Sequence, residues 1–142
     1  MIEAVHRTFR VEVSPAEAWA RLAQIDRWPE WAPHITAATV SPAGALGPAS
    51  TGALRIRGLG RTAFRMTVWE PGRRWTWVGA MPGATVTYEH GFAPAGEAAT
   101  TLDWVVSLDG PLAFVIRPLF ARIYGRNLDR AIPRLKAWIA TA

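Results

Sequence analysis

The chain has 142 residues, enough for one domain with a sizeable core, and we expect residues 1–142 to form a single domain. It carries a net charge of +5 and no cysteine, which excludes a disulfide framework, thiolate catalysis and metal sites built on thiolates. No apolar run approaches the roughly 18 residues of a membrane span, and the charged N-terminal segment lacks the apolar core of a signal peptide. We therefore expect a cytoplasmic protein.

The first part of the chain predicts one strand followed by two short helices. Residues 3–13 alternate between apolar and polar, which is typical of a half-buried strand, although Arg7 interrupts the apolar side. Ser14 then provides a helix N-cap, with a proline in the first position and Glu17 three residues after the cap. The segment 25–31, IDRWPEW, predicts a second short helix or turn.

The middle of the chain predicts six further strands. They are residues 34–41, 52–58, 61–70, 73–80, 84–93 and 99–109. Short turns rich in Gly and Pro join the last five of them, so neighbouring strands are antiparallel. One parity along the strands is apolar and the other is mostly polar, which predicts a sheet with one dry face and one wet face. The dry parity includes Phe64, Met66, Val68, Trp75, Trp77, Tyr88, His90 and Trp104.

The end of the chain, residues 110–142, predicts a long amphipathic helix. Ile116, Phe120 and Ile123 belong to its apolar face, because they recur at three- and four-residue steps. An amphipathic helix needs an apolar partner, which here is the dry face of the sheet. The elements therefore predict an α+β domain in which a curved antiparallel sheet of about seven strands wraps on the long C-terminal helix.

Two features of this helix carry separate expectations. Pro118 and Pro133 each remove a backbone donor, so we expect a break or kink near each. A basic stripe also runs along the helix, made of Arg122, Arg126, Arg130 and Arg134. Asp129 is the only acid in the segment, so the stripe is either solvated or paired with other elements, or makes weak contact with an anionic membrane.

Several short motifs accompany this order of elements. They are VEVSPAEAW at 11–19, IDRWPEW at 25–31, EPGRRW at 70–75, EHGF at 89–92 and RNLDRAIPRLKAWI at 126–139. Together they resemble the helix-grip fold of the START/Bet v 1-like (SRPBCC) superfamily, and within it the bacterial polyketide cyclase/dehydrase and lipid-transport-like proteins. The resemblance implies a ligand cavity between sheet and helix, with Trp28 and Trp31 beside its mouth. A shared fold does not choose among carriers, cyclases, hydrolases and co-chaperones.

The dry face and the helix supply the candidate site residues. We expect the ligand to contact Phe64, Met66, Trp75, Trp77, Tyr88, His90, Trp104, Ile116, Phe120 and Ile123. The chain has eight tryptophans, and such rings either fill a core or line a cavity for an apolar ligand. His90 is the candidate catalytic residue, as a general acid or base, but it also suits a ligand hydrogen bond or a structural role in the core. Tyr88 lies on the same face, about 6.6 Å away.

Other chemistry is not indicated. His6, His34 and His90 stand far apart without an acidic pattern, so we expect no metal site. There is no phosphate-binding glycine loop or dinucleotide fingerprint, so we expect no cofactor. The basic residues are spread over the chain without interleaved aromatics, so we expect no nucleic-acid partner. The aromatase/cyclases that the chain resembles use an arginine late in the fourth strand, where this sequence has Val68 or Trp69.

Three functions follow from this reading. The preferred one is binding, with or without transport, of an apolar or aromatic small molecule such as a polyketide or a lipid in the cavity. The second is a polyketide cyclase or dehydratase in which His90 moves protons. The third is a partner-binding module with a filled core and no ligand.

Overall fold

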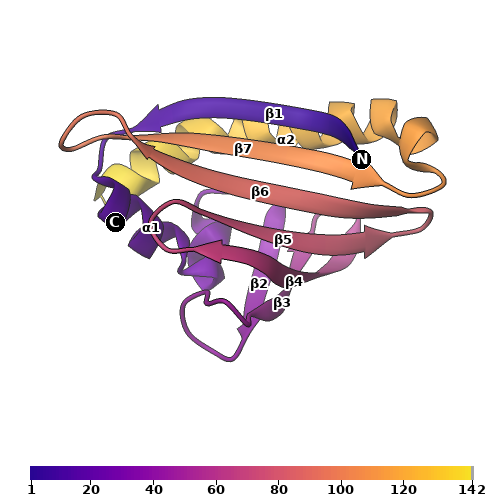
Figure 1. Cartoon of the computed structure of the whole chain (residues 1–142), viewed down its shortest axis with the longest axis horizontal. Coiled ribbons are helices and arrows are strands. Elements are labelled where there is room, and N and C mark those ends of the chain that lie inside the picture. The colour runs from indigo at the N-terminus through magenta and orange to yellow at the C-terminus, as the bar shows by residue number, and fades with distance from the viewer. Residues whose placement is uncertain (142) are drawn as a thin grey trace.

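The chain forms one curved antiparallel sheet that wraps around a long helix (Figure 1). The computed structural model describes residues 1–141, and nothing is stated for Ala142. The strands are β1 (Ile2–Val11), β2 (Ile35–Ser41), β3 (Thr51–Ile56), β4 (Gly60–Glu70), β5 (Arg74–Met81), β6 (Ala84–Pro94) and β7 (Thr100–Asp109). The helices are α1 (Pro15–Leu22), the 3-10 helix η1 (Ile25–Glu30) and α2 (Ala113–Thr141). This is the predicted helix-grip architecture.

The strand order places the first and the last strand of the sequence side by side. The sheet runs β1-β7-β6-β5-β4-β3-β2, so β1 pairs with β7, the last strand of the sheet. The helix α2 lies along β1 and β7, while α1 sits at the end of the molecule where α2 finishes (Figure 1). Ser14 caps α1 as predicted, its hydroxyl accepting from the backbone N–H of Glu17 at 3.3 Å.

We predicted a break or a kink near each proline, and because α2 is uninterrupted from Ala113 to Thr141 the break is wrong. Pro118 and Pro133 both lie within the helix and both are exposed. Water can therefore hydrogen-bond the carbonyls that these prolines leave without a partner, which removes most of the reason to end the helix there. The helix also begins at Ala113 rather than at residue 110, after a turn in which the Leu112 N–H donates to the carbonyl of Gly83 at 2.9 Å.

A β-bulge in β4 changes which side chains face inward. The pairing with β5 shifts between Met66 and Val68, so the alternation is reset after Met66. Trp69, rather than the predicted Val68, then packs edge-on against Trp19 with ring centroids 5.0 Å apart. Alternation alone missed this change because one inserted residue inverts the parity of everything after it.

The Arg7 that interrupts the apolar side of β1 pairs with the helix. Its guanidinium donates to both carboxylate oxygens of Asp129 on α2, at 2.8 and 3.3 Å. The guanidinium packs against Gly125 of α2, where an added Cβ would lie 3.0 Å from it. The pair holds the middle of α2 against β1. No helix within residues 1–141 combines the length and hydrophobicity needed to cross a membrane.

Candidate ligand-binding cavity

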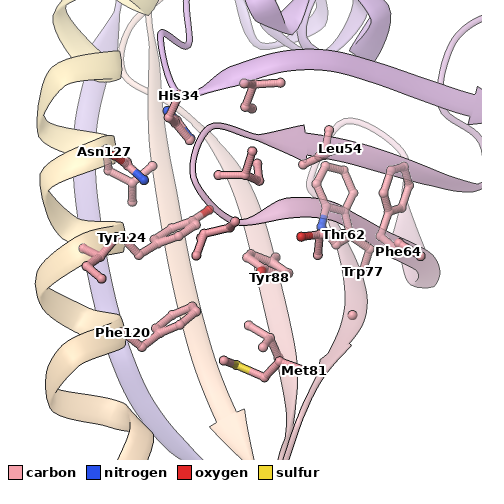
Figure 2. A pocket seen from close by; sticks show the side chains of 18 of the residues that line it. His34, Leu54, Thr62, Phe64, Trp77, Met81, Tyr88, Phe120, Tyr124 and Asn127 are labelled. Atoms are coloured by element: carbon pink, nitrogen blue, oxygen red, sulfur yellow. The ribbon is translucent and has the colours of Figure 1, made fainter.

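A cavity of about 730 Å³ lies between α2 and the inner face of the sheet. Figure 2 shows side chains of the sheet and of α2 pointing into it from opposite sides. The volume is in the range of small-molecule sites in proteins. The space between sheet and helix that the sequence predicted is therefore hollow.

Most of the predicted ligand contacts line this cavity. They are Phe64, Trp77, Tyr88, His90, Trp104, Ile116, Phe120 and Ile123. Met66 and Trp75 do not line it, which corrects the prediction for these two residues. Trp75 is fully buried under α1, with its ring centroid 4.8 Å from that of Trp19. Met66 is likewise part of the packed core. Parity identifies the face of a strand, but not where along that face the cavity ends.

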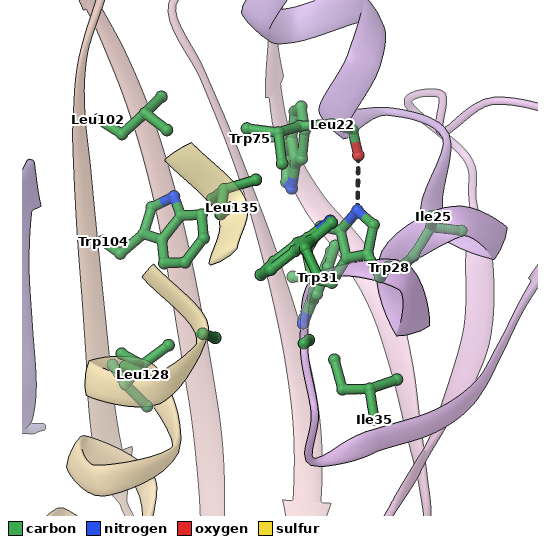
Figure 3. Close-up of a cluster of buried hydrophobic side chains, with 14 of the residues drawn as sticks. Leu22, Ile25, Trp28, Trp31, Ile35, Trp75, Leu102, Trp104, Leu128 and Leu135 are labelled. Atoms are coloured by element: carbon green, nitrogen blue, oxygen red, sulfur yellow. Dashed lines mark hydrogen bonds between the residues drawn. The ribbon is translucent and has the colours of Figure 1, made fainter. Parts of the chain in front are cut away.

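The inner end of the cavity is closed by aromatic rings. Trp28 and Trp31 of η1 and the following turn line it and are only 5% and 2% exposed, so they lie at the closed end rather than at the mouth. The Trp28 indole N–H donates to the Leu22 carbonyl at 2.8 Å, which fixes its ring (Figure 3). Trp104 and Leu128 belong to the same buried cluster. The tryptophans thus pack the core and line the cavity at once.

His90 lies inside this aromatic cluster. Its ring centroid is 4.6 Å from that of Trp77 and 5.4 Å from that of Trp75, and its Nδ1 is buried without a hydrogen-bond partner. Burial lowers the pKa of His90 to about 3, against a smaller opposing effect from backbone groups of Trp75 and Tyr88. At pH 7 the imidazole is therefore neutral: it keeps one ring N–H for hydrogen bonding but is not the imidazolium that a general acid would need.

Four uncharged polar residues that the sequence analysis did not select also line the cavity: Tyr124, Asn127, His34 and Thr62. Tyr124 and Asn127 come from α2, and Figure 2 shows them on the side of the cavity facing Tyr88. The signal for Tyr124 was available, since it follows Phe120 by four residues and their rings stack with centroids 5.5 Å apart. His34 lies in the turn before β2, where no periodicity marks it.

These polar groups are uncharged. Burial raises the pKa of Tyr88 to about 12, and burial together with the neighbouring Tyr88 raises the pKa of Tyr124 further. Burial lowers the pKa of His34 to about 4. Neither tyrosine hydroxyl makes a hydrogen bond to another group in residues 1–141. The cavity therefore presents neutral hydrogen-bonding groups within an apolar wall.

The charge in the cavity wall is of one sign, positive. Arg61 is its only charged lining residue, and no carboxylate lines it in the part of the chain that the structure describes. Arg65 is exposed on β4, and Trp69 packs against Trp19 and Trp75, so no guanidinium projects from the end of β4 into the cavity. No cluster of three or more His, Asp or Glu within residues 1–141 has the geometry of a metal site.

The mouth of the cavity lies at the opposite end from η1. The exposed lining residues lie in or beside the β3–β4 turn, the β5–β6 turn and the first half of α2: Leu59, Arg61, Ala63, Ala80, Pro82, Val115, Leu119 and Ile123. Ile123, one of the predicted ligand contacts, is 41% exposed and forms part of this edge. The helix thus closes one side of the cavity and frames its opening.

The sheet, the long helix and the cavity between them are those of a helix-grip fold. A family model described as polyketide cyclase/dehydrase and lipid transport matches residues 3–139, and the chain belongs to this family. No curated protein matches the sequence. The predicted resemblance is confirmed at the level of the family.

Solved structures give the same fold at low sequence identity. A START superfamily protein from Mycobacterium smegmatis is 14% identical, with a TM-score of 0.76 over 97% of each chain. An aromatase/cyclase from a Streptomyces species is 14% identical, with a TM-score of 0.78 over 96% of this chain and 92% of that one. A truncated norcoclaurine synthase from Thalictrum flavum is 12% identical, with a TM-score of 0.70 over 92% of this chain and 91% of that one. At such identities the likeness concerns the fold alone.

Proposed function

We propose that this protein binds an apolar or aromatic small molecule, neutral or anionic, in the cavity between α2 and the sheet. The observation that carries the proposal is a cavity of about 730 Å³ walled by aromatic and aliphatic side chains. Transfer of apolar ligand surface from water into such a site is favourable by about 25 cal/mol per Å², before the costs of association. A polyketide or a lipid has the required apolar surface.

The polar groups favour a ligand with a few hydrogen-bonding atoms. The hydroxyls of Tyr88 and Tyr124 lack protein partners and stay protonated, so each can donate to a ligand carbonyl or hydroxyl oxygen. A cationic ligand finds no carboxylate in the wall, whereas an anionic group can lie near Arg61 at the mouth. We therefore place the apolar body of the ligand inside and any anionic group outward.

Binding is better supported than acid–base turnover. A general acid or base works best with a pKa near the operating pH, and the pKa of His90 is lowered to about 3 by burial. The cyclase-type arginine near the end of β4 is also missing, since Val68 and Trp69 stand there. The third function, a partner-binding module with a filled core, conflicts with the size of the cavity.

A fluorescent apolar dye tests the proposal directly. We expect anilinonaphthalene sulfonate, an anionic aromatic, to bind and to be displaced by the native ligand. Ile116→Trp should abolish dye binding because a larger ring then fills the cavity that Ile116 lines. Ile132→Trp is the matched control, since Ile132 lies on the same helix, is half-buried and does not line the cavity.

Equal dye binding by both variants, with melting points near that of the wild type, would overturn the proposal. A second experiment, native mass spectrometry of the protein purified from its own host, would identify a bound ligand by the mass that it adds. Loss of the adduct in Ile116→Trp but not in Ile132→Trp would place that ligand in the cavity.

A further inference from the structure

Exposed apolar side chains are concentrated around the mouth of the cavity. Of the large apolar residues that are exposed within residues 1–141, all except Met1 belong to the segments that frame the mouth; this apolar rim is Leu59, Leu112, Phe114, Val115, Leu119 and Ile123, of which Leu59, Val115, Leu119 and Ile123 line the cavity. Phe114 is 82% exposed and Val115 is 76% exposed. Scattered exposed apolar residues are ordinary in proteins, but a contiguous group around an opening marks an interaction surface.

The rim is assembled from segments that are distant in sequence. Leu59 comes from the β3–β4 turn, while Val115, Leu119 and Ile123 come from α2, and all four line the same cavity. Leu112 packs against Gly83 in the β5–β6 turn, where an added Cβ would come within 2.5 Å of it. The rim is therefore one surface and not a set of separate exposed residues.

Positive charge predominates beside the apolar rim, and the nearest acid in sequence, the exposed Asp109, pairs with the N-terminal ammonium at 3.4 Å. The segments that frame the rim, residues 51–69, 71–88 and 110–128, contain no Asp or Glu. Four exposed rim arginines lie in them: Arg57, Arg61, Arg122 and Arg126. On α2, Arg122 follows Leu119 by three residues and Arg126 follows Ile123 by three, so each guanidinium neighbours an apolar rim residue.

Within residues 1–141 the four rim arginines have no ion-pair partner, as is also true of other exposed arginines such as Arg130 and Arg134. The arginines that do pair are Arg7, Arg10, Arg21, Arg27 and Arg74. The one acid of α2, Asp129, is already engaged by Arg7. Charge on the rim is thus available to an external partner.

We propose that the mouth docks on an anionic lipid surface, with the apolar rim in the headgroup and upper acyl region and the rim arginines on lipid phosphates. Apolar side chains bordered by cations are the pattern of interfacial membrane binding. A second copy of this chain fits the rim poorly, because two mouths would bring unpaired arginines together without any acid. The cavity would then open directly onto the lipid.

This proposal goes beyond the proposed function. It assigns lipid contact to only two of the four arginines in the basic stripe, Arg122 and Arg126. Arg122 and Arg126 adjoin the apolar rim, whereas Arg130 and Arg134 are roughly 16 and 22 Å further along the helix than Leu119. The last two are also exposed and unpaired within residues 1–141, so they provide a control of equal charge on the same helix.

Vesicle co-sedimentation separates the two pairs of arginines. The wild type should bind vesicles made of equal parts phosphatidylglycerol and phosphatidylcholine at low salt, and bind pure phosphatidylcholine weakly. At about 1 kcal/mol for each basic residue near the surface, the double variant Arg122→Gln, Arg126→Gln should bind about 30-fold more weakly. The double variant Arg130→Gln, Arg134→Gln should stay within about threefold of the wild type.

A site-specific probe tests the orientation. Because the sequence has no cysteine, Val115→Cys carries a single environment-sensitive dye, and its emission should shift to the blue on the anionic vesicles. The same dye on Ala137→Cys, at an exposed position near the far end of α2, should not shift. Equal effects of the two arginine pairs, or equal shifts of the two dyes, would overturn the proposal.

Two further results distinguish the alternatives. A concentration-dependent dimer in light scattering that Leu119→Ser dissolves, without vesicle binding, would assign the rim to a second copy and overturn lipid docking. Ile116→Trp, whose cavity is filled, should still bind vesicles, and Arg122→Gln, Arg126→Gln should still bind the dye in solution. The two proposals, ligand binding in the cavity and lipid docking of the rim, can therefore be disproved independently of each other.

Discussion

The two ends of the cavity are built in opposite ways. At the closed end, under α1 and η1, the side chains of Trp31 and Trp75 are 2% and 0% exposed, and the ring of Trp19 packs edge-on against that of Trp75 at 4.8 Å. At the mouth, Phe114 and Val115 are 82% and 76% exposed. The same kinds of apolar side chain therefore contribute to folding at one end and face solvent at the other.

The charges follow the same division. Near the closed end Arg21 pairs with Glu17 on α1, and Arg27 pairs with Glu30 on η1 at 2.9 Å while lying over the Trp138 ring. The rim arginines at the mouth have no carboxylate partner among the described residues. Buried rings contribute to folding at the closed end, so we expect stability to be concentrated there, whereas the apolar and basic side chains at the mouth are available for contact.

The largest effect should come from removing a ring at the closed end. Trp75→Ala should lower the free energy of unfolding by about 3–5 kcal/mol, because a fully buried aromatic ring leaves a cavity behind. Urea denaturation followed by circular dichroism measures this directly. A loss below about 1 kcal/mol would mean that the aromatic cluster is loosely packed.

Acid should weaken the closed end through its buried histidine. The pKa of His90 is about 3 in the folded protein and near 6.5 when unfolded, so below pH 6.5 the unfolded chain takes up a proton that the folded protein does not. Its contribution is complete above pH 6.5 and is lost as the pH falls toward 3. Between pH 7 and pH 5 His90 alone should cost about 2 kcal/mol of stability.

The variant His90→Gln checks this assignment, because its side chain does not titrate. Its urea midpoint should change less between pH 7 and pH 5 than that of the wild type. The exposed His6, whose pKa is raised by its hydrogen bond to Asp103, acts in the opposite direction, so both proteins should carry His6→Gln. Parallel pH profiles would show that His90 is not buried as a neutral group.

The wall between the two ends depends on a glycine. A Cβ at Gly52 would collide with the backbone oxygen of Thr39 and lie within 2.6 Å of the Phe64 ring, which stacks on Trp77. Gly52→Ala should therefore cost about 1–3 kcal/mol by overpacking and also change dye affinity, because Phe64 and Trp77 both line the cavity. An unchanged melting temperature and an unchanged dye affinity would show that the neighbouring strand and Phe64 can shift to accommodate the added methyl group.

The smallest effect belongs to the mouth. Phe114→Ser should change the free energy of unfolding by less than about 0.5 kcal/mol, since an exposed ring loses almost no burial when it is removed. Thermal melts of this variant and of Trp75→Ala, recorded together, compare the two ends directly. If Phe114→Ser lowered the melting temperature as much as Trp75→Ala does, the two ends of the cavity would not differ in their contribution to stability.

Most of the elements, and the faces that they turn inward, could be predicted from local patterns in the sequence. Alternation along the strands placed Tyr88, His90 and Trp104 on the inner face, and the Ser14 cap opened α1 where it was expected. These predictions succeeded because local periodicity and capping depend on residues within a few positions of each other. They failed where one inserted residue reset the alternation at Met66, and where solvent allowed α2 to continue through Pro118.

Only the tertiary structure decided where the cavity lies and what surrounds its mouth. Trp75 and Trp77 share one parity of one strand, yet Trp77 lines the cavity and Trp75 is sealed beneath α1, because burial depends on the element packed above each ring. The meeting of Leu59 with Leu119 and Ile123 has no local sequence signal either. Such contacts arise from the curvature of the sheet and the docking of α2, which bring together residues more than 50 positions apart.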